Sequence, residues 1–316
     1  MIQSELSSKV ENIAQKLELR QLVVIQFLVL ISSKLRYTSR GLTRKLGLPQ
    51  VHLYRLIHEF SDILEPKDVN IETKKDLTGE IANYAKKMLL GIKINQNAIK
   101  EMINKYQKNR PKPDRNLDQF NATMATTVKR VTKLASNGDL VGKEIAFLGD
   151  DDLVSIGVAL THQCKKITVF EIDDRLNNLI IQISQENNLN IEVVKQDLRQ
   201  LIDKSHFGKY DLVFTDPPYT KGGINLFLNQ AIKLIKKNFL GRIYLCYGNS
   251  DRAREREVEI QKLILDHNLI IKTKLNQFNK YYGAESIGSQ SSLYILDWTP
   301  STKTVELNFK KVYTND

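Results

Sequence analysis

Carboxylate side chains follow several short apolar runs in this sequence, and their types and spacing could bind and activate an amine. The three aspartates from Asp150 to Asp152 come directly after an apolar run and Gly149. Asp216 follows another apolar run and begins the sequence Asp-Pro-Pro-Tyr. An ammonium group becomes a nucleophile only after it loses a proton, and a carboxylate can hold the ammonium and accept that proton. The predicted catalytic residues are Asp150, Asp151, Asp152 and Asp216.

The turn that begins at Asp216 is the most specific of these signals. Pro217 and Pro218 restrict the backbone to an extended form, so the Asp216 carboxylate and the Pro217 carbonyl can converge on an amino group. Tyr219 is then expected to stack or pack against that group. We prefer Asp216 for orienting the nucleophile. Like charges in a cluster raise the pKa of one member, and the sequence leaves open which one.

Residues before a predicted helix at 124–136 are expected beside the same site. Gln119 and Phe120 could contact the substrate there, although an ordinary helix N-terminal region explains them equally well. The predicted substrate-binding residues are Pro217, Pro218, Tyr219, Gln119 and Phe120.

Acids also follow the second and third apolar runs, where a nucleoside would bind. Glu171 lies about twenty residues after the glycine turn, the usual position of an acid that binds a ribose diol. Asp173 is a second candidate that could instead cap the next helix. Asp197 is placed to accept from an adenine amine, with Leu198 flanking the ring. The predicted cofactor-binding residues are Gly149, Glu171, Asp173, Asp197 and Leu198.

The charge of the turn at Gly149 indicates which ligand it suits. Turns that bind a pyrophosphate carry several glycines, which let backbone amides approach the phosphate, whereas this turn has one glycine followed by acids. Those acids favour a cation, such as a sulfonium nucleoside, a protonated amine or a metal ion. Complementing a helix dipole would explain one or two of them but not all three.

These residues can meet only if the apolar runs are neighbouring strands of one sheet. Strand-sized runs at 144–148, 167–172, 191–194 and 212–214 alternate with helix-sized segments. This alternation is typical of an α/β fold with a doubly wound parallel sheet. Ligands bind such a sheet at the carboxyl ends of its strands, which is where each acid falls.

The first 67 residues predict a small helical domain. Apolar residues recur at helical spacing from Leu6 to Leu17, and a more apolar helix is expected over 20–32. Two further helices, the second over 50–60, are separated by Gly47 and resemble a winged helix-turn-helix. The exposed face of this pair has few base-reading side chains. A role in dimer contacts or in supporting the catalytic domain is therefore favoured over DNA binding.

Three segments are expected along the chain. They are a winged helix-turn-helix-like domain at 1–67, a helical linker region at 68–115 and a catalytic domain at 116–316. The stretch 108–115 combines charges with two prolines and is the predicted boundary.

Composition sets broader limits. With 316 residues, of which 41% are hydrophobic, the chain can form two domains with a sizeable core. The net charge of +11 is spread along the chain, so nucleic-acid binding is possible but not favoured. Cys164 and Cys246 are expected as buried thiols, and no metal site or tightly bound cofactor is predicted. No apolar run has membrane length and no signal peptide is evident, so a cytoplasmic location is expected.

The combined motifs resemble those of the branched-chain polyamine synthase family. They are Gly149 to Leu153 and residues 171–176, 215–220, 223–228 and 277–282. The resemblance implies an aminopropyltransferase with a Rossmann-like, methyltransferase-type domain behind a small winged-helix-like domain. It also implies decarboxylated S-adenosylmethionine as co-substrate, a spermidine-like acceptor that could receive two transfers on its secondary amine, and release of 5′-methylthioadenosine. A homodimer is expected.

Two other functions remain open from the sequence. One is an S-adenosylmethionine-dependent N-methyltransferase that acts on a nucleic-acid base amine. Its donor carries a carboxylate that three aspartates would repel, whereas the decarboxylated donor ends in an ammonium that they would attract. The other is a DNA-binding regulator with an inactive transferase domain, and it would depend on residues 1–67.

Overall fold

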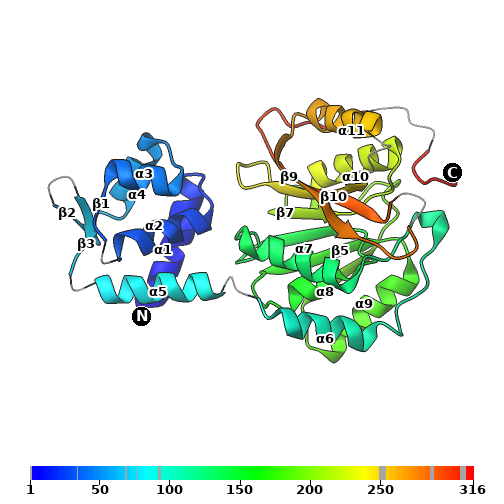
Figure 1. The fold of residues 1–316 in the computed structure, drawn as a ribbon, viewed down its shortest axis with the longest axis horizontal. Helices are drawn as coiled ribbons and strands as arrows, with labels where there is room; N and C mark the ends of the chain where they lie inside the picture. Colours follow the sequence, from blue (N-terminus) through cyan, green and yellow to red (C-terminus); the bar gives the residue numbers. More distant parts are fainter. Residues whose placement is uncertain are drawn as a thin grey trace. The chain divides into compact units, whose positions relative to one another are not determined.

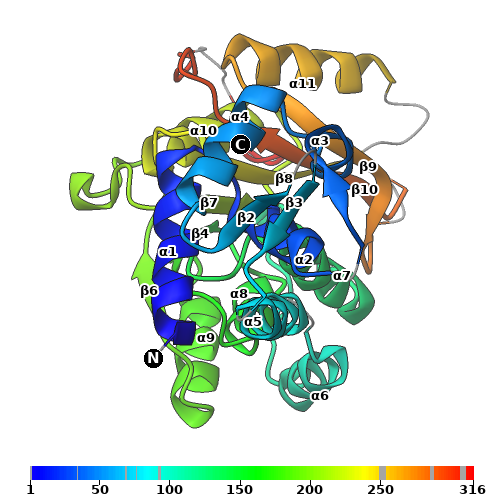
Figure 2. The same ribbon diagram turned by 90° about the vertical axis from the view of Figure 1, so that its left-hand side faces the viewer.

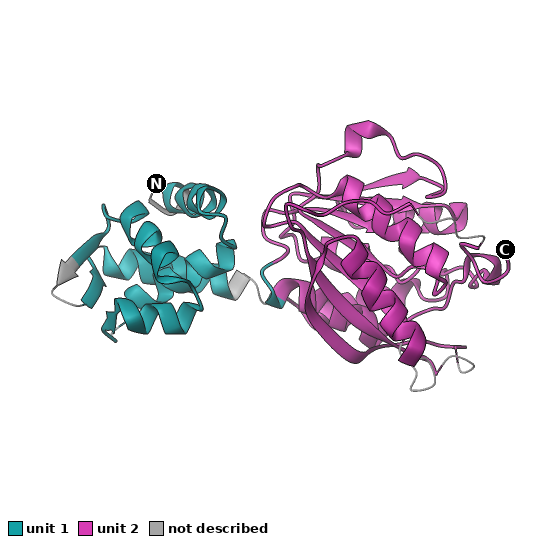
Figure 3. Cartoon of the chain, turned by 90° about the horizontal axis from the view of Figure 1, so that it is seen from above, with its two compact units in different colours: residues 1–93, 136–138 teal, residues 94–135, 139–316 magenta. Residues whose placement is uncertain are grey.

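The computed structural model describes residues 2–33, 35–67, 70–75, 77–91, 94–248, 254–284, 288–306 and 311–316. The chain divides into two compact units, which Figure 3 shows in different colours. The first contains Met1–Lys93 and Ser136–Gly138, and the second contains Ile94–Ala135 and Asp139–Asp316.

The first unit combines helices with a small antiparallel sheet. Its elements are α1 (Ile2–Lys16), α2 (Gln21–Ile31), β1 (Tyr37–Thr38), α3 (Ser39–Leu46), α4 (Gln50–Glu59), β2 (Leu64–Lys67), β3 (Asn70–Thr73) and α5 (Thr78–Gly91). The sheet order is β1-β3-β2, and Figure 2 shows β2 and β3 with the helices of this unit. The expected helices at 20–32 and 50–60 are confirmed as α2 and α4, whereas the three strands were not predicted.

Local sequence explains the ends of the short helices in this unit. The Thr38 hydroxyl accepts a hydrogen bond from the Gly41 backbone N–H at 3.1 Å, which caps α3. Gly47 ends α3 in the left-handed conformation, with a φ of 65°. The apolar helix α2 supplies the centre of the core, where Phe27 stacks on Phe60 with ring centroids 5.8 Å apart.

The second unit is an α/β domain built on a seven-stranded sheet (Figure 1). Its helices are α6 (Gln96–Tyr106), α7 (Met124–Ser136), α8 (Val154–Ala159), α9 (Asp174–Glu186), α10 (Lys221–Leu234) and α11 (Arg254–Asp266), with short 3-10 turns at Arg115–Leu117 and Lys204–His206. Its strands are β4 (Glu144–Leu148), β5 (Lys166–Glu171), β6 (Ile191–Lys195), β7 (Leu212–Thr215), β8 (Arg242–Gly248), β9 (Ile270–Lys280) and β10 (Gln290–Asp297).

The strand order is β6-β5-β4-β7-β8-β10-β9. The first five strands in this order are parallel, and β10 is antiparallel to both of its neighbours. The predicted α/β fold with a doubly wound sheet is therefore confirmed, and the four strands expected from apolar runs are β4 to β7.

Two apolar layers cover the sheet. Ile145 and Phe147 of β4 pack with α6 to α9 on one face, whereas Ala146 and Leu148 pack with α10 and α11 on the other. Alternate residues of a strand point to opposite faces, so this central strand is apolar throughout.

The direction of winding reverses at β4. This strand pairs with β5 on one side and with β7 on the other, both in parallel. The segments that follow β4 and β7 therefore leave the same edge of the sheet at adjacent positions, where doubly wound sheets bind their ligands.

The boundary between the units falls inside the range 68–115 that the sequence predicts to be a single linker region. Helix α5 belongs to the first unit and α6 to the second. The residues between them at 92–93 lie outside the described part of the chain, as do 68, 69 and 76. The proline-containing stretch 108–115 lies within the second unit.

Candidate active site

A buried arginine on α7 joins the two segments that carry the predicted catalytic acids. Arg130 is 1% exposed, and its Nη1 donates to Asp152 Oδ2 at 2.6 Å. Its Nη2 donates to Asp216 Oδ2, also at 2.6 Å. The Arg130 Nε donates to the Asn279 side-chain oxygen at 2.9 Å. The carboxylates after β4 and β7 thus share one guanidinium group.

Asp152 is enclosed by donors. Besides Arg130, its Oδ1 accepts from Arg110 Nη2 at 2.7 Å and from the Ala122 backbone N–H at 2.6 Å. Arg110 also donates to the Asp151 carbonyl oxygen. Two guanidinium groups and a backbone amide leave Asp152, which is 2% exposed, little capacity for a further ligand.

Asp150 caps a helix. Its Oδ1 accepts from the Val154 backbone N–H at 2.8 Å, and its Oδ2 accepts from the Ser155 backbone N–H at 3.1 Å, at the start of α8. Burial raises the pKa of Asp150 to about 7, although these hydrogen bonds favour the charged form. The carboxylate points into α8 and supports the loop.

Asp151 differs from its two neighbours. It is half-buried, and its carboxylate accepts no hydrogen bond from the residues that the structure describes. Burial raises its pKa well above the ordinary value, the charges of Asp152 and Asp216 raise it further, and Arg110 opposes them. Asp151 is therefore the member of the triplet with a carboxylate available to a ligand.

Asp216 lies at the head of the turn after β7, and two tyrosines contact its carboxylate. Tyr281 OH donates to Oδ2 at 2.7 Å, and Tyr219 OH donates to Oδ1 at 3.0 Å. Burial raises the pKa of Asp216, and Arg130 opposes this effect. The Asp216 side chain is 15% exposed, so it keeps limited access to solvent.

Both prolines of this turn, Pro217 and Pro218, are buried. No described residue donates a hydrogen bond to the Pro217 carbonyl oxygen. Tyr219 packs against Tyr247, with the two ring centroids 5.2 Å apart. Phe120 packs with the cluster of Ala122, Tyr281 and Ala284, so an aromatic lining lies beside the acids.

The predicted nucleoside acids lie at the ends of β5 and β6. Glu171 is 5% exposed and accepts from the backbone N–H groups of Asp150 at 3.1 Å and Asp173 at 2.9 Å. These bonds place Glu171 directly beside the turn at Gly149, which has a φ of 71°. Burial raises the pKa of Glu171 despite the backbone donors.

Asp173 does cap α9, as one of the two sequence-based hypotheses proposed. Its Oδ1 accepts from the Arg175 backbone N–H at 3.0 Å. Gln119 Nε2 donates to its other oxygen at 3.2 Å. Burial would raise the pKa of Asp173, but the hydrogen bonds from Arg175 and Gln119 outweigh it and lower the value.

Asp197 and Leu198 follow β6. The Asp197 carboxylate is bound by Arg199, whose Nε and Nη2 donate at 3.0 Å and 2.8 Å. Hydrogen bonds from Arg199 lower the pKa of Asp197. The Leu198 side chain lies in the buried layer beneath the sheet edge with Phe170.

Several residues of this site were missed from the sequence. Arg130 sits on α7 without any motif around it, and Arg110 lies in the stretch predicted as a boundary. Tyr281 belongs to the segment 277–282, one of the motifs of the family resemblance. That motif was the only signal in the sequence that could have indicated Tyr281 as a site residue. An arginine buried on an amphipathic helix cannot be distinguished by spacing alone from one that faces solvent.

Charge defines what the site can bind. The site contains five carboxyl groups (Asp150, Asp151, Asp152, Glu171, Asp216) and two guanidinium groups, Arg110 and Arg130. The surplus of negative charge and the raised pKa of Asp151 suit a cationic ligand that loses a proton there. Among the described residues, no group of histidine, cysteine and acidic side chains is arranged to hold a metal ion.

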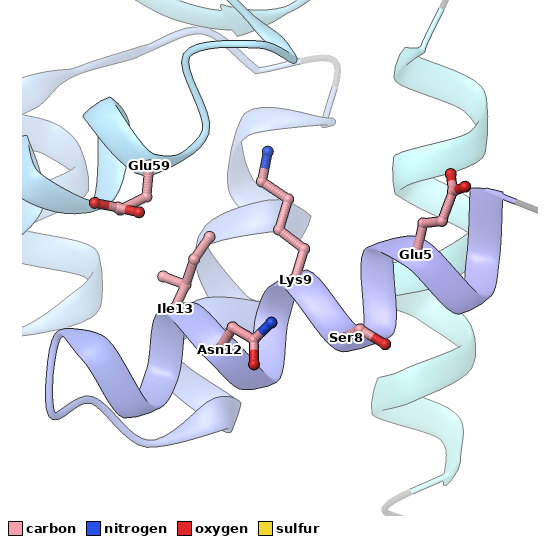
Figure 4. A pocket seen from close by; sticks show the side chains of 6 residues that line it. All are labelled: Glu5, Ser8, Lys9, Asn12, Ile13 and Glu59. Carbon is pink, nitrogen blue, oxygen red and sulfur yellow. The ribbon is translucent and has the colours of Figure 1, made fainter.

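The structure also has a surface hollow. It belongs to the first unit, has a volume of about 550 Å³, and is lined by Glu5, Ser8, Lys9, Asn12, Ile13 and Glu59 (Figure 4). It is open and mixed in polarity, so we assign the chemistry to the acids of the second unit.

No helix in the described ranges has the length and apolarity needed to cross a bilayer.

Together, the strand order, the antiparallel β10 between β8 and β9, and the acidic turn after β4 define a Rossmann-like fold of the methyltransferase type. The profile of the branched-chain polyamine synthase A C-terminal domain matches residues 98–315. The chain belongs to the branched-chain polyamine synthase family.

Two relatives from Methanocaldococcus jannaschii are similar to this chain in sequence. An uncharacterised protein is 31% identical over 312 residues, which cover 96% of this chain and 73% of the relative. An N(4)-bis(aminopropyl)spermidine synthase is 35% identical over 189 residues, which cover 59% of this chain and 54% of the synthase. The chain thus matches about half the length of that synthase.

A solved structure extends the likeness of fold to nearly the whole chain. The branched-chain polyamine synthase from Thermus thermophilus, in complex with N4-aminopropylspermidine and 5′-methylthioadenosine, has a TM-score of 0.60. It is 19% identical, and the match covers 96% of this chain and 94% of that one. The likeness shows the shared fold.

Proposed function

We propose that this chain transfers the aminopropyl group of decarboxylated S-adenosylmethionine to an amine of a spermidine-like polyamine, and releases 5′-methylthioadenosine. The observation that carries the proposal is the surplus of carboxyl groups where β4 and β7 end. A polyamine and a decarboxylated sulfonium donor are both cations, and such a site attracts them. The family relatives named as bis(aminopropyl)spermidine synthases support the same chemistry.

Transfer joins the acceptor nitrogen to the methylene carbon attached to sulfur. The carbon–sulfur bond breaks, its electron pair stays on sulfur, and the leaving group is a neutral thioether. The new amine carries an additional proton, which must pass to a base or to water. Holding the two cations in line supplies much of the acceleration.

The residues divide this work between them. Asp151 holds the reacting amine and accepts its proton, because its carboxylate is the one that no described partner occupies. Asp216, fixed by Arg130 and Tyr281, orients the amine together with the Pro217 carbonyl oxygen. Asp150 and Asp152 keep the loop after β4 in place. Glu171 holds the ribose of the donor and Asp197 holds its adenine. Asp197 also forms an ion pair with Arg199.

The acceptor is proposed to react at its secondary amine and to do so twice, giving a branched product. Methylene chains can pack on the ring faces of Tyr219, Tyr281 and Phe120 while the charged nitrogens meet the acids. Mass spectrometry of the products with spermidine decides between one transfer and two.

One assay separates the candidate reactions. The protein is incubated with spermidine and either decarboxylated S-adenosylmethionine or S-adenosylmethionine, and the nucleoside product is identified. We expect 5′-methylthioadenosine from the decarboxylated donor and no S-adenosylhomocysteine from the other. Release of S-adenosylhomocysteine with a nucleic-acid acceptor would instead establish the methyltransferase alternative.

The first unit is proposed to be a winged helix-turn-helix that supports the enzyme. Helices α3 and α4 meet at Gly47, and the antiparallel pair of β2 and β3 follows them. Val51 and Tyr54 are exposed on α4, and apolar side chains there suit protein contacts better than base edges. We propose that the chain forms a homodimer, which light scattering of the intact protein tests.

A further inference from the structure

The C-terminal segment Lys311–Asp316 lies beside the site and has no role in the scheme above. The Asp316 carboxylate accepts hydrogen bonds from the backbone N–H groups of Val312 and Tyr313, both at 2.8 Å. These bonds close the segment into a turn. Tyr313 lies within this turn and is only 7% exposed.

Two anchors hold the segment, one at each side of the site. Thr220, directly after the Asp216 turn, donates from Oγ1 to the Val312 carbonyl oxygen at 2.6 Å. Asp118 Oδ2 accepts from the Thr314 backbone N–H at 2.8 Å and from its hydroxyl at 3.0 Å. The residue after Asp118 is Gln119, which contacts Asp173 beyond β5. The segment therefore runs from the end of β7 to the loop beside the end of β5.

The packing at the first anchor requires a glycine. A Cβ atom on Gly223, in the first turn of α10, would lie 2.8 Å from the Val312 carbonyl oxygen and 2.8 Å from that of Pro218. Both distances are far below an ordinary contact, and both atoms are backbone. Helix α10 can therefore approach the segment and the proline turn together only because residue 223 has no side chain.

The environment of Tyr313 places its ring at the nucleoside end of the site. Burial raises the pKa of Tyr313 to about 12, and the charges of Asp197 and Glu171 contribute to the rise. The Arg199 guanidinium, which binds Asp197, lies 5.6 Å from the centre of the Tyr313 ring. Asp197 and Glu171, two of the three carboxylates that act on this phenol, are those proposed to hold the donor nucleoside.

We infer that Tyr313 forms a wall of the donor site, where its ring packs against the adenosine of the sulfonium donor. The assignment depends on the proposed function, because Glu171 and Asp197 are donor residues only under it. An aromatic face stacks on a purine without needing a specific hydrogen bond, and loss of such a stack weakens binding severalfold or more.

Calorimetry with 5′-methylthioadenosine on the full chain tests the wall. Tyr313→Ala should raise the dissociation constant about tenfold, because the ring is lost, while Tyr313→Phe should stay within about twofold. Asp118→Ala removes the second anchor and should weaken binding by a smaller factor with the ring intact. Tyr54→Ala, an exposed tyrosine of the first unit, is the matched control.

The results separate the wall from the proposed function. If the wild type does not bind 5′-methylthioadenosine but binds S-adenosylhomocysteine, the proposed function fails. If the wild type binds the former and Tyr313→Ala binds equally well, the wall is overturned. Tighter binding by Tyr313→Ala would also overturn it, because the segment would then be occluding the site. A Tyr313→Ala protein that keeps the wild-type melting temperature excludes misfolding as the cause of weaker binding.

Discussion

Three adjacent aspartates with three different environments are the main feature at the residue scale. Asp150 is bound by a helix N-terminus and Asp152 by two arginines, whereas the Asp151 carboxylate has no described partner. The same side chain therefore serves as a cap, as an ion-pair partner and as a ligand-binding group. The difference arises from which donors surround each carboxylate, not from the residue type.

Asp151→Asn should lower turnover by about two to four decades, the usual range for a positioned acid or base, and should leave 5′-methylthioadenosine affinity within a few fold. The measurement is the rate at saturating donor, which separates chemistry from binding. Asp174→Asn is the matched control, because Asp174 is exposed and paired with Lys195. Near-normal turnover of Asp151→Asn would show that another group accepts the proton.

The pH dependence of the same enzyme reports on this carboxyl group. Because the pKa of Asp151 is raised by burial and neighbouring acids, the rate should fall with decreasing pH well above the ordinary carboxyl range. In Asp151→Asn, the residual rate should lose this acid limb.

Asp150→Asn should have a different effect, on stability. The pKa of Asp150 is raised from 3.8 to about 7 in the folded chain, so its stabilising contribution is fully present below 3.8 and is lost as pH rises through about 7. The asparagine keeps an oxygen for the α8 cap but does not titrate. Between about pH 5 and pH 8, the wild type should lose about 2 kcal/mol of unfolding free energy more than the variant. Chemical denaturation at both pH values measures this, and equal losses would contradict it.

At the scale of elements, α7 connects the loop after β4 to the turn after β7. Arg130 is the connecting group, and it lies 22 residues before Asp152 and 86 before Asp216 in sequence. Helix α7 belongs to the layer of helices on one face of the sheet (Figure 1). The separation of the two acids thus depends on how α7 packs.

Arg130→Met should destabilise the fold by about 3–5 kcal/mol, because it leaves two buried carboxylates without their shared partner. Asp216→Asn in the same background should recover part of that loss, and this coupling is the diagnostic result of the double-mutant cycle. Lys195→Met, at the exposed pair with Asp174, should change stability little. Strict additivity of the two substitutions would show that Arg130 and Asp216 act separately.

At the scale of the whole molecule, each unit has its own core. The buried cluster around α2 draws on residues 6–85, whereas the two clusters against the large sheet draw on residues 99–296. Every predicted site residue belongs to the second unit. We therefore expect the first unit to be dispensable for the chemistry itself.

A fragment of residues 94–316 should fold and bind 5′-methylthioadenosine within a few fold of the full chain, because its core and its acids are all internal. Denaturation and calorimetry on the fragment measure both properties. Loss of binding by a folded fragment would show that the first unit contributes to the site.

The full chain is expected to show no sequence-specific DNA binding, which a salt titration with duplex DNA checks.

The sequence alone determined strands β4 to β7 and the positions of the acids. Glycine and proline end the apolar runs locally, and a parallel sheet brings the ends of its strands to one edge, so Gly149, Glu171 and Asp216 could be expected near each other. Local periodicity likewise predicted α7 over 124–136. These features depend on neighbouring residues in the chain, which is why they could be read without the fold.

Only the tertiary structure decided which acid is available to a ligand. Arg130, Arg110 and the C-terminal segment come from distant parts of the chain, and their packing satisfies Asp152 and places Tyr313 near Glu171. A side chain's ionisation and partners depend on what surrounds it in space, and burial strengthens every such interaction. The three aspartates are equivalent in sequence, and long-range packing is what distinguishes Asp151 from the other two.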